Sequence, residues 1–243
     1  MENNWFESWF DSPYYHLLYR DRNEQEAQSF LNILLRRIHL AGDSKVLDLA
    51  CGKGRHSRHL HQQGLDVTGI DLSPENIQFC KQFENETLHF YEHDMRRLFR
   101  TNYFDAVFNL FTSFGYFDRP HENEQVIMAA SKSLKPGGYF IIDFLNPTYA
   151  IQHLTASHAI ELDGVRFDIT KKIVQQKIIK EIHVTDGTKG FDFREEVRLI
   201  YPDDFQQFFA HAGLSVLETY GDYLLNYLQS EQSNRLIYIT RKI

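Results

Sequence analysis

Acidic residues and glycines lie close together early in the chain, in a pattern that could bind a nucleoside. Residues 46–57 read VLDLACGKGRHS, so an apolar run carries Asp48 and leads to Gly52 and Gly54. A second acidic residue, Asp71, ends the next apolar segment. Glycine has no Cβ and lets the backbone approach a ligand closely, and a carboxylate after a strand can accept hydrogen bonds from ribose hydroxyls. The pattern predicts a pocket for an adenine nucleoside whose other end carries charge.

The acidic residue ahead of the glycines distinguishes two classes of cofactor. Dinucleotide sites favour a third glycine, where this chain has Ser57, and Asp48 would repel a pyrophosphate. S-adenosylmethionine carries an ammonium group and a sulfonium, which a carboxylate attracts. The site therefore favours S-adenosylmethionine. An NAD(P)-dependent oxidoreductase and a non-catalytic S-adenosylmethionine-binding module are kept as alternatives.

Two further segments follow predicted strands and could complete the pocket. Asp94 could accept a hydrogen bond from the exocyclic amine of an adenine, and Met95 could pack on the face of its ring. Asn109 and Phe111 come at the end of the next strand, where a transferable methyl group should lie.

Strands and helices alternate over the first 144 residues. Ser73 and Pro74 form a strong helix start, with Ser73 as the cap. Such alternation predicts a mainly parallel sheet with helices on both faces. We expect strands at 45–49, 66–70, 88–91, 104–110 and 139–144, helices at 24–39, 55–63, from 74, and at 122–134, and one or two short helices within 5–19.

The hydrophobic pattern changes after the fifth predicted strand. From 166 to 201 apolar residues alternate with period two, and Asp186-Gly187 is a hairpin signal. We expect an antiparallel insertion that forms a lid, then a helix and two strands. The predicted parts are 1–144 (N-terminal helices and cofactor core), 145–201 (insertion) and 202–243, with its helix at 202–211 and its strands at 215–220 and 235–241.

In order along the chain, residues 46–54, 69–73, Asp94, 104–107 and 134–138 resemble the motifs of class I S-adenosylmethionine-dependent methyltransferases. The resemblance implies a Rossmann-like seven-stranded sheet with an antiparallel last strand, and S-adenosylhomocysteine as the product. Ala50 departs from the pattern, because it replaces the first loop glycine. The expected cofactor-binding residues are Asp48, Ala50, Gly52, Gly54, Arg55, Asp71, Leu72, Asp94, Met95, Asn109 and Phe111.

A narrower resemblance lies in residues 109–117, 194–200, 221–223 and Arg235, which look like bacterial sugar-amine and glycine N-methyltransferases. It implies a small-molecule acceptor. We expect nitrogen in preference to oxygen as the methylated atom, and the residues themselves leave nitrogen, oxygen and carbon open. Methyl transfer mainly requires alignment and exclusion of water, and no catalytic triad is visible. We expect Phe114, Tyr116 and Phe117 to bind the acceptor, Tyr14 and Tyr116 to be the catalytic candidates, and Arg20 to be a candidate clamp for the methionine carboxylate.

Composition limits the other function classes. Lys and Arg total 26 against 33 Asp and Glu, so the formal net charge of −7 argues against a nucleic-acid substrate. Two cysteines, Cys51 and Cys80, lack disulfide-framework or metal-site spacing, and no metal is expected. No signal peptide or membrane-spanning run is visible, so a cytoplasmic location is expected. The Ile-rich insertion could pair between subunits as a homodimer.

Overall fold

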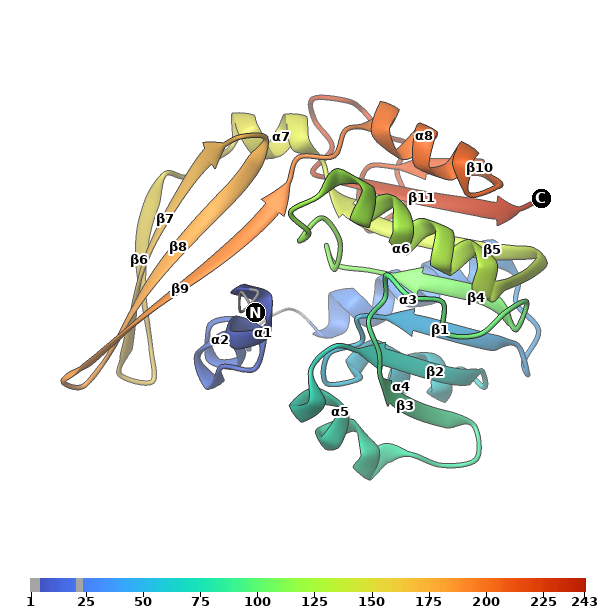
Figure 1. Ribbon diagram of the computed structural model, residues 1–243, viewed down its shortest axis with the longest axis horizontal. Coiled ribbons are helices and arrows are strands. Elements are labelled where there is room, and N and C mark those ends of the chain that lie inside the picture. The colour runs from blue at the N-terminus through green and yellow to red at the C-terminus, as the bar shows by residue number, and fades with distance from the viewer. Residues whose placement is uncertain (1–4, 21–23) are drawn as a thin grey trace.

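A seven-stranded sheet forms the centre of the protein (Figure 1). The computed structural model describes residues 5–20 and 24–243. The first five strands run parallel, and β11 pairs antiparallel with both β5 and β10. This arrangement confirms the predicted Rossmann-like fold. In spatial order the strands are β10 (Leu214–Tyr220), β11 (Arg235–Lys242), β5 (Leu134–Leu145), β4 (Phe104–Asn109), β1 (Lys45–Leu49), β2 (Asp66–Asp71) and β3 (Leu88–Glu92).

Helices cover both faces of this sheet. Neighbouring side chains of a strand point to opposite faces. Val46 accordingly joins a hydrophobic cluster with Phe30 of α3, whereas Leu47 joins a cluster with Val126 of α6. The helices on the first face are α3 (Glu24–Ile38), α4 (Arg55–Gln62) and α5 (Pro74–Cys80), followed by the short 3-10 helix η1 (Lys81–Phe83); those on the second are α6 (Pro120–Ser133) and α8 (Pro202–His211).

Two boundaries differ from the sequence-based expectation by more than one residue. β5 begins at Leu134 rather than Tyr139, because the Lys-Pro-Gly-Gly segment continues the strand after a shift in its register against β4. Gly137 has a positive φ of 77°, which glycine adopts without steric cost. α6 begins at Pro120, two residues before the predicted start.

A second sheet of four antiparallel strands confirms the predicted insertion, with the order β6 (Ser157–Leu162), β7 (Val165–Val174), β8 (Lys177–Asp186) and β9 (Lys189–Arg198). The sequence did not predict β6, whose side chains are almost all exposed and therefore lack an apolar face. It also did not predict α7 (Pro147–Gln152), which Asn146 caps by accepting a hydrogen bond from the Thr148 amide at 3.1 Å.

The N-terminal helices α1 (Trp5–Phe10) and α2 (Pro13–Leu18) lie between the two sheets (Figure 1). Trp9 is fully buried in a third hydrophobic cluster with Phe167 and Ile182 of the antiparallel sheet. These helices therefore share a core with the antiparallel sheet, whereas the predicted division groups them with the cofactor core. Within the residues that the structure describes, no helix is long and apolar enough to cross a membrane.

Candidate active site

The loop between β1 and α4 carries three residues with positive φ: Ala50 at 58°, Gly52 at 55° and Gly54 at 70°. The two glycines differ in their surroundings. A Cβ on Gly54 would lie 2.8 Å from Cε1 of Phe90, so only glycine fits there. A Cβ on Gly52 would meet no described atom within 4 Å. Gly54 is thus needed for packing, while Gly52 leaves the backbone open to an approaching ligand.

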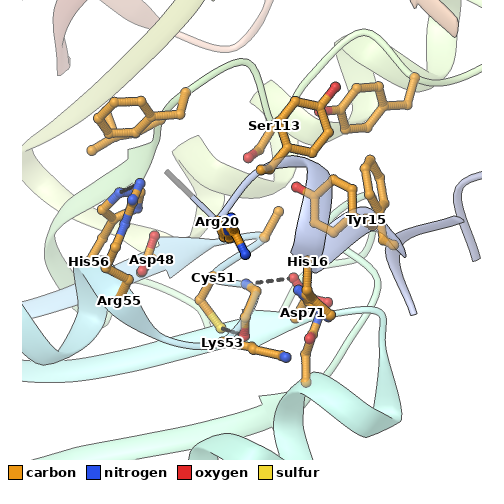
Figure 2. A pocket seen from close by; sticks show the side chains of 18 residues that line it. Tyr15, His16, Arg20, Asp48, Cys51, Lys53, Arg55, His56, Asp71 and Ser113 are labelled. Atoms are coloured by element: carbon orange, nitrogen blue, oxygen red, sulfur yellow. Dashed lines mark hydrogen bonds between the residues drawn. The ribbon is translucent and has the colours of Figure 1, made fainter. Parts of the chain in front are cut away.

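A cavity of about 390 Å³ opens above this loop (Figure 2). Arg55 and His56 lie on one side of it, Asp71 and His16 lie on the other, and Arg20 lies between them. The walls come from α2 and the residues after it, the glycine loop, the end of β2, α5 and the loop after β4. The lining residues are Phe10, Tyr15, His16, Tyr19, Arg20, Asp48, Ala50, Cys51, Gly52, Lys53, Arg55, His56, Asp71, Asn76, Leu110, Phe111, Ser113 and Tyr116.

Asp71 is fixed by backbone donors at the end of β2. The Gly52 amide donates to its Oδ2 at 2.8 Å (Figure 2) and the Ser73 amide to its Oδ1 at 2.9 Å. Burial raises the pKa of this carboxyl despite these bonds. Each carboxylate oxygen retains acceptor capacity. The side chain can therefore accept hydroxyl donors from a ligand in the cavity.

Asp48 is almost fully buried beneath the same loop, with 2% of its surface exposed. The Ser57 hydroxyl donates to its Oδ2 at 2.6 Å. Burial raises the pKa of Asp48 to about 7, which the Ser57 bond opposes and the nearby charge of Asp71 reinforces. A cationic group that enters the cavity would favour the ionised form.

A smaller cavity of about 70 Å³ lies beside the first, and Phe10, Ala50, Asp71 and Tyr116 line both. The structure brings the expected adenine-binding residues together here. Asp94 accepts two hydrogen bonds from Arg96 Nε, each at 3.0 Å, and one from its Nη2 at 2.6 Å, and these bonds hold the pKa of Asp94 below its ordinary value. The residues that line only this smaller cavity are Phe6, Leu72, His93, Asp94, Met95 and Phe117.

The loop after β4 forms another wall of the main cavity. The Phe111 ring stacks on His56 with centroids 4.6 Å apart, and the Arg55 guanidinium lies 5.6 Å from the Phe111 centroid. Asn109 lies behind this wall rather than on it. It is fully buried, and its Nδ2 donates to the Ser113 carbonyl at 3.1 Å. Asn109 thus supports the loop from within the protein.

The aromatic residues expected at the acceptor site lie in two different environments, the cavity lining and the hydrophobic core. Tyr116 lines both cavities and Phe117 the smaller one. Phe114 does not fit the expectation: it is fully buried, and its ring contacts Phe144 and Phe205 with centroids 6.0 and 5.8 Å away. It belongs to the hydrophobic core because its side chain points to the opposite side of the loop.

Tyr14 also lies outside the lining of both cavities, which removes the geometric basis for a catalytic role. Its hydroxyl donates to Asp186 at 3.0 Å and its ring packs on Phe191, toward the hairpin of the antiparallel sheet. The next residue along α2, Tyr15, lines the main cavity instead.

Several lining residues were not among the expected contacts. The sequence-based site omits Tyr19, Lys53 and Asn76. Asn76 is 5% exposed, and its Oδ1 has no hydrogen-bond partner among the residues that the structure describes. Its place one turn into α5, two residues after Pro74, was the only available signal. Desolvation and the charge of Lys53 lower the pKa of His16, which lines the same cavity.

Comparisons with known proteins agree with this geometry. Residues 46–138 match a family described as a methyltransferase domain. The chain is 27% identical to a dTDP-3-amino-3,4,6-trideoxy-alpha-D-glucopyranose N,N-dimethyltransferase from Streptomyces venezuelae over 236 residues, covering 93% of this chain and 94% of that protein.

Solved structures share the fold over nearly the whole chain. A S-adenosylmethionine-dependent methyltransferase from Clostridium acetobutylicum superposes with a TM-score of 0.80 at 22% identity, covering 94% of this chain and 96% of that one. An amino pentose methyltransferase from Micromonospora echinaspora, solved with S-adenosylmethionine bound, superposes with a TM-score of 0.71 at 19% identity, covering 96% and 98%. The family match over residues 46–138 and the similarity to an amino-sugar N,N-dimethyltransferase along almost the whole chain support a class I S-adenosylmethionine-dependent methyltransferase of the bacterial small-molecule group, and the solved structures show that the chain has the methyltransferase fold.

Proposed function

We propose that this enzyme methylates a nitrogen atom of a small-molecule amine. The observation that carries the proposal is the composition of the main cavity. The acidic glycine-loop region faces an aromatic and histidine-bearing wall from α2. The amino-sugar N,N-dimethyltransferase that the chain matches along almost its whole length supports an amine acceptor.

The residues around the glycine loop fit S-adenosylmethionine. The open side of Gly52 gives a ligand access to the backbone, and the orphan Oδ1 of Asn76 offers a further acceptor. Asp71 and Asn76 would hold the ribose hydroxyls, and Asp48 the ammonium group. Arg20, whose guanidinium also pairs with Asp163, would hold the carboxylate.

The smaller cavity would take the adenine, between the apolar side chains of Leu72 and Met95 and within reach of Asp94. Ala50, Gly54, Arg55 and Phe111 would complete the loop and wall around the cofactor, as the sequence predicts. Asn109, which the sequence predicts to bind the cofactor, would instead support this wall from within the protein. When bound, S-adenosylmethionine would supply a methyl group on a sulfonium, whose carbon a nucleophile attacks in line with the carbon–sulfur bond so that S-adenosylhomocysteine leaves.

The remaining lining residues would deprotonate and orient the acceptor. An amine must lose its proton before its lone pair can attack, and His16, with a pKa below its ordinary value of 6.5, is largely neutral at pH 7. A ring nitrogen of His16 would accept that proton. The rings of Tyr15, Tyr19 and Tyr116 would orient the acceptor and exclude water.

Turnover of matched acceptors tests the proposal. The protein would be incubated with S-adenosylmethionine and with pairs of compounds that differ only by an amine or a hydroxyl, including amino sugars and their parent sugars. We expect release of S-adenosylhomocysteine with amines, and mass spectrometry should place the methyl group on nitrogen. Asp71→Asn serves as the cofactor-site control. Methylation of the hydroxyl partners, or binding of NADH without binding of S-adenosylhomocysteine, would overturn the proposal.

A further inference from the structure

The loop after β4 holds two consecutive non-glycine residues in the left-handed backbone region. Phe111 has a φ of 57° and Thr112 a φ of 60°. This region is disfavoured for aromatic side chains and especially for β-branched ones. Such a conformation persists only where surrounding contacts impose it, and it concentrates at functional sites. The contacts that impose it here come from two strands distant in sequence.

Asp143 of β5 holds the backbone of both residues. Its Oδ2 accepts a hydrogen bond from the Phe111 amide at 2.8 Å, and its main-chain oxygen accepts one from the Thr112 amide at 3.1 Å. Arg235 of β11 completes the arrangement. Its Nε donates to Asp143 Oδ1 at 2.7 Å, and its Nη2 donates to Thr112 Oγ1 at 2.8 Å. One guanidinium thus links the carboxylate to the loop that the carboxylate supports.

This ion pair is buried. Asp143 has no exposed surface and the Arg235 side chain is 14% exposed. Tyr223 packs on the Phe111 ring with centroids 5.2 Å apart, and its hydroxyl partly offsets the rise that burial causes in the pKa of Asp143. A buried ion pair is often no more stabilising than apolar residues of the same volume. Stability alone therefore gives little reason for this pair, whereas control of the loop gives a direct one.

The supported loop controls two parts of the cavity wall. Phe111 lies against His56 and Arg55. The Thr112 carbonyl accepts a hydrogen bond from the Tyr116 hydroxyl, and Tyr116 lines both cavities. We propose that Asp143 and Arg235 are positioning residues that hold the loop after β4, so that Phe111 and Tyr116 align the acceptor with the bound cofactor. The alignment of an acceptor rests on the proposed function, whereas the control of the loop does not.

Three variants separate the roles of the contacts. Arg235→Lys keeps the charge but loses the planar fork that reaches both Asp143 and Thr112. Thr112→Val keeps the shape of the side chain and removes only the hydroxyl, whereas Thr112→Ser keeps the hydroxyl. Arg166→Lys is the matched control, because Arg166 makes a comparable fork to Asp168 on the exposed antiparallel sheet.

A spectroscopic measurement tests loop control without any acceptor. The Phe111 ring lies over His56 and should shift its ring-proton resonances upfield. We expect Arg235→Lys and Thr112→Val to lose this shift, and Thr112→Ser and Arg166→Lys to keep it. An unchanged His56 resonance in the first two variants, in protein that remains folded by circular dichroism, would overturn the proposal. This measurement remains valid if amines prove not to be the acceptors.

Kinetics then tests alignment with an acceptor that the wild-type protein methylates. Arg235→Lys and Thr112→Val should lower kcat tenfold or more while the Kd for S-adenosylhomocysteine changes less than threefold. Asp48 and Asp71 lie on β1 and β2 and Gly52 on the loop after β1, so that Phe111 is the one residue placed around the cofactor that belongs to the loop after β4. Thr112→Ser should restore kcat. An equal loss of kcat and of S-adenosylhomocysteine affinity, together with a lowered Tm, would show a merely structural role and overturn the positioning role.

Discussion

Trp9 Nε1 donates a hydrogen bond to Glu195 Oε1 at 2.7 Å, across 186 positions of sequence. The Tyr19 hydroxyl donates to the same oxygen at 2.6 Å, and Lys180 Nζ lies 3.4 Å from Oε2. The Glu195 carboxylate on β9 thereby connects α1, the end of α2 and β8. Because α2 and the residues after it supply Tyr15, His16, Tyr19 and Arg20 to the cavity, the antiparallel sheet determines where that wall lies.

Removal of this carboxylate should destabilise the protein. Glu195→Ala removes the acceptor of the Trp9 N–H and the charge partner of the Lys180 ammonium, whose side chain is only 12% exposed. We expect a loss of about 2–4 kcal/mol in the free energy of unfolding, measured by urea denaturation. The control is Glu181→Ala, which breaks an exposed, solvent-screened pair with Lys172 and should cost much less stability than Glu195→Ala. Equal losses of unfolding free energy in the two variants would show that the Glu195 network stabilises the protein no more than an exposed ion pair does.

The parallel sheet could be predicted from the sequence because its strands are covered on both faces. Such strands are continuous apolar runs, as in residues 45–49, where every side chain after Lys45 is buried. β6 escaped prediction because its exposed side chains carry no such signal. The packing of α1 and α2 was also inaccessible, since hydrophobic spacing shows that a helix buries a face but not against which sheet.

The sequence could predict those parts of the candidate site in which a functional side chain lies at the end of a parallel strand. Asp48 and Asp71 lie as expected because parallel strands end at one edge of the sheet, where ligands bind. Within the aromatic cluster the expectation fails for Phe114, because neighbouring residues point in different directions: Phe114 enters the core while Tyr116 lines the cavity. Asn76 was omitted because an amide inside a helix has no distinctive sequence pattern.

Asp48→Asn should stabilise the ligand-free protein in a pH-dependent way. The folded pKa of about 7 lies above the ordinary value of 3.8, so the unfolded chain releases this proton first as the pH rises. The contribution of Asp48 to stability therefore declines between about pH 4 and pH 7 and stays at its lower value above that range. Asparagine does not titrate and can still accept the Ser57 bond. The free energy of unfolding of the variant relative to the wild type, measured in urea, should increase from pH 5 to pH 8, and a pH-independent difference would contradict the assignment.

The same titration should appear in cofactor binding. If the ionised form of Asp48 holds the ammonium group, the binding-competent fraction rises as the pH passes through about 7. Calorimetry should then show S-adenosylhomocysteine affinity increasing by about tenfold from pH 6 to pH 8, as that fraction does. Asp48→Asn should bind more weakly at both pH values and lose this dependence. A pH dependence of the same size in the variant would show that a group other than Asp48 titrates.

Substitutions of the two loop glycines should affect different properties: one should mainly lower the stability of the protein, and the other should mainly weaken cofactor binding. Gly54→Ala places a Cβ 2.8 Å from the Phe90 ring at a φ of 70°, and overpacking with backbone strain should cost about 2–4 kcal/mol of unfolding free energy. Gly52→Ala has a similar φ of 55° but open space around the new methyl group, so strain alone should cost about 1–2 kcal/mol.

The order should reverse for cofactor binding. The Gly52 methyl group would occupy the face of the loop that lines the main cavity, and we expect at least a tenfold loss of S-adenosylhomocysteine affinity by calorimetry. Gly54→Ala, measured at a temperature where it is fully folded, should retain more affinity than Gly52→Ala, because its methyl group points toward Phe90 and Cys80 rather than into the cavity. Unchanged affinity in Gly52→Ala would mean that the ligand does not approach this stretch of backbone, and the cofactor would have to lie elsewhere in the cavity.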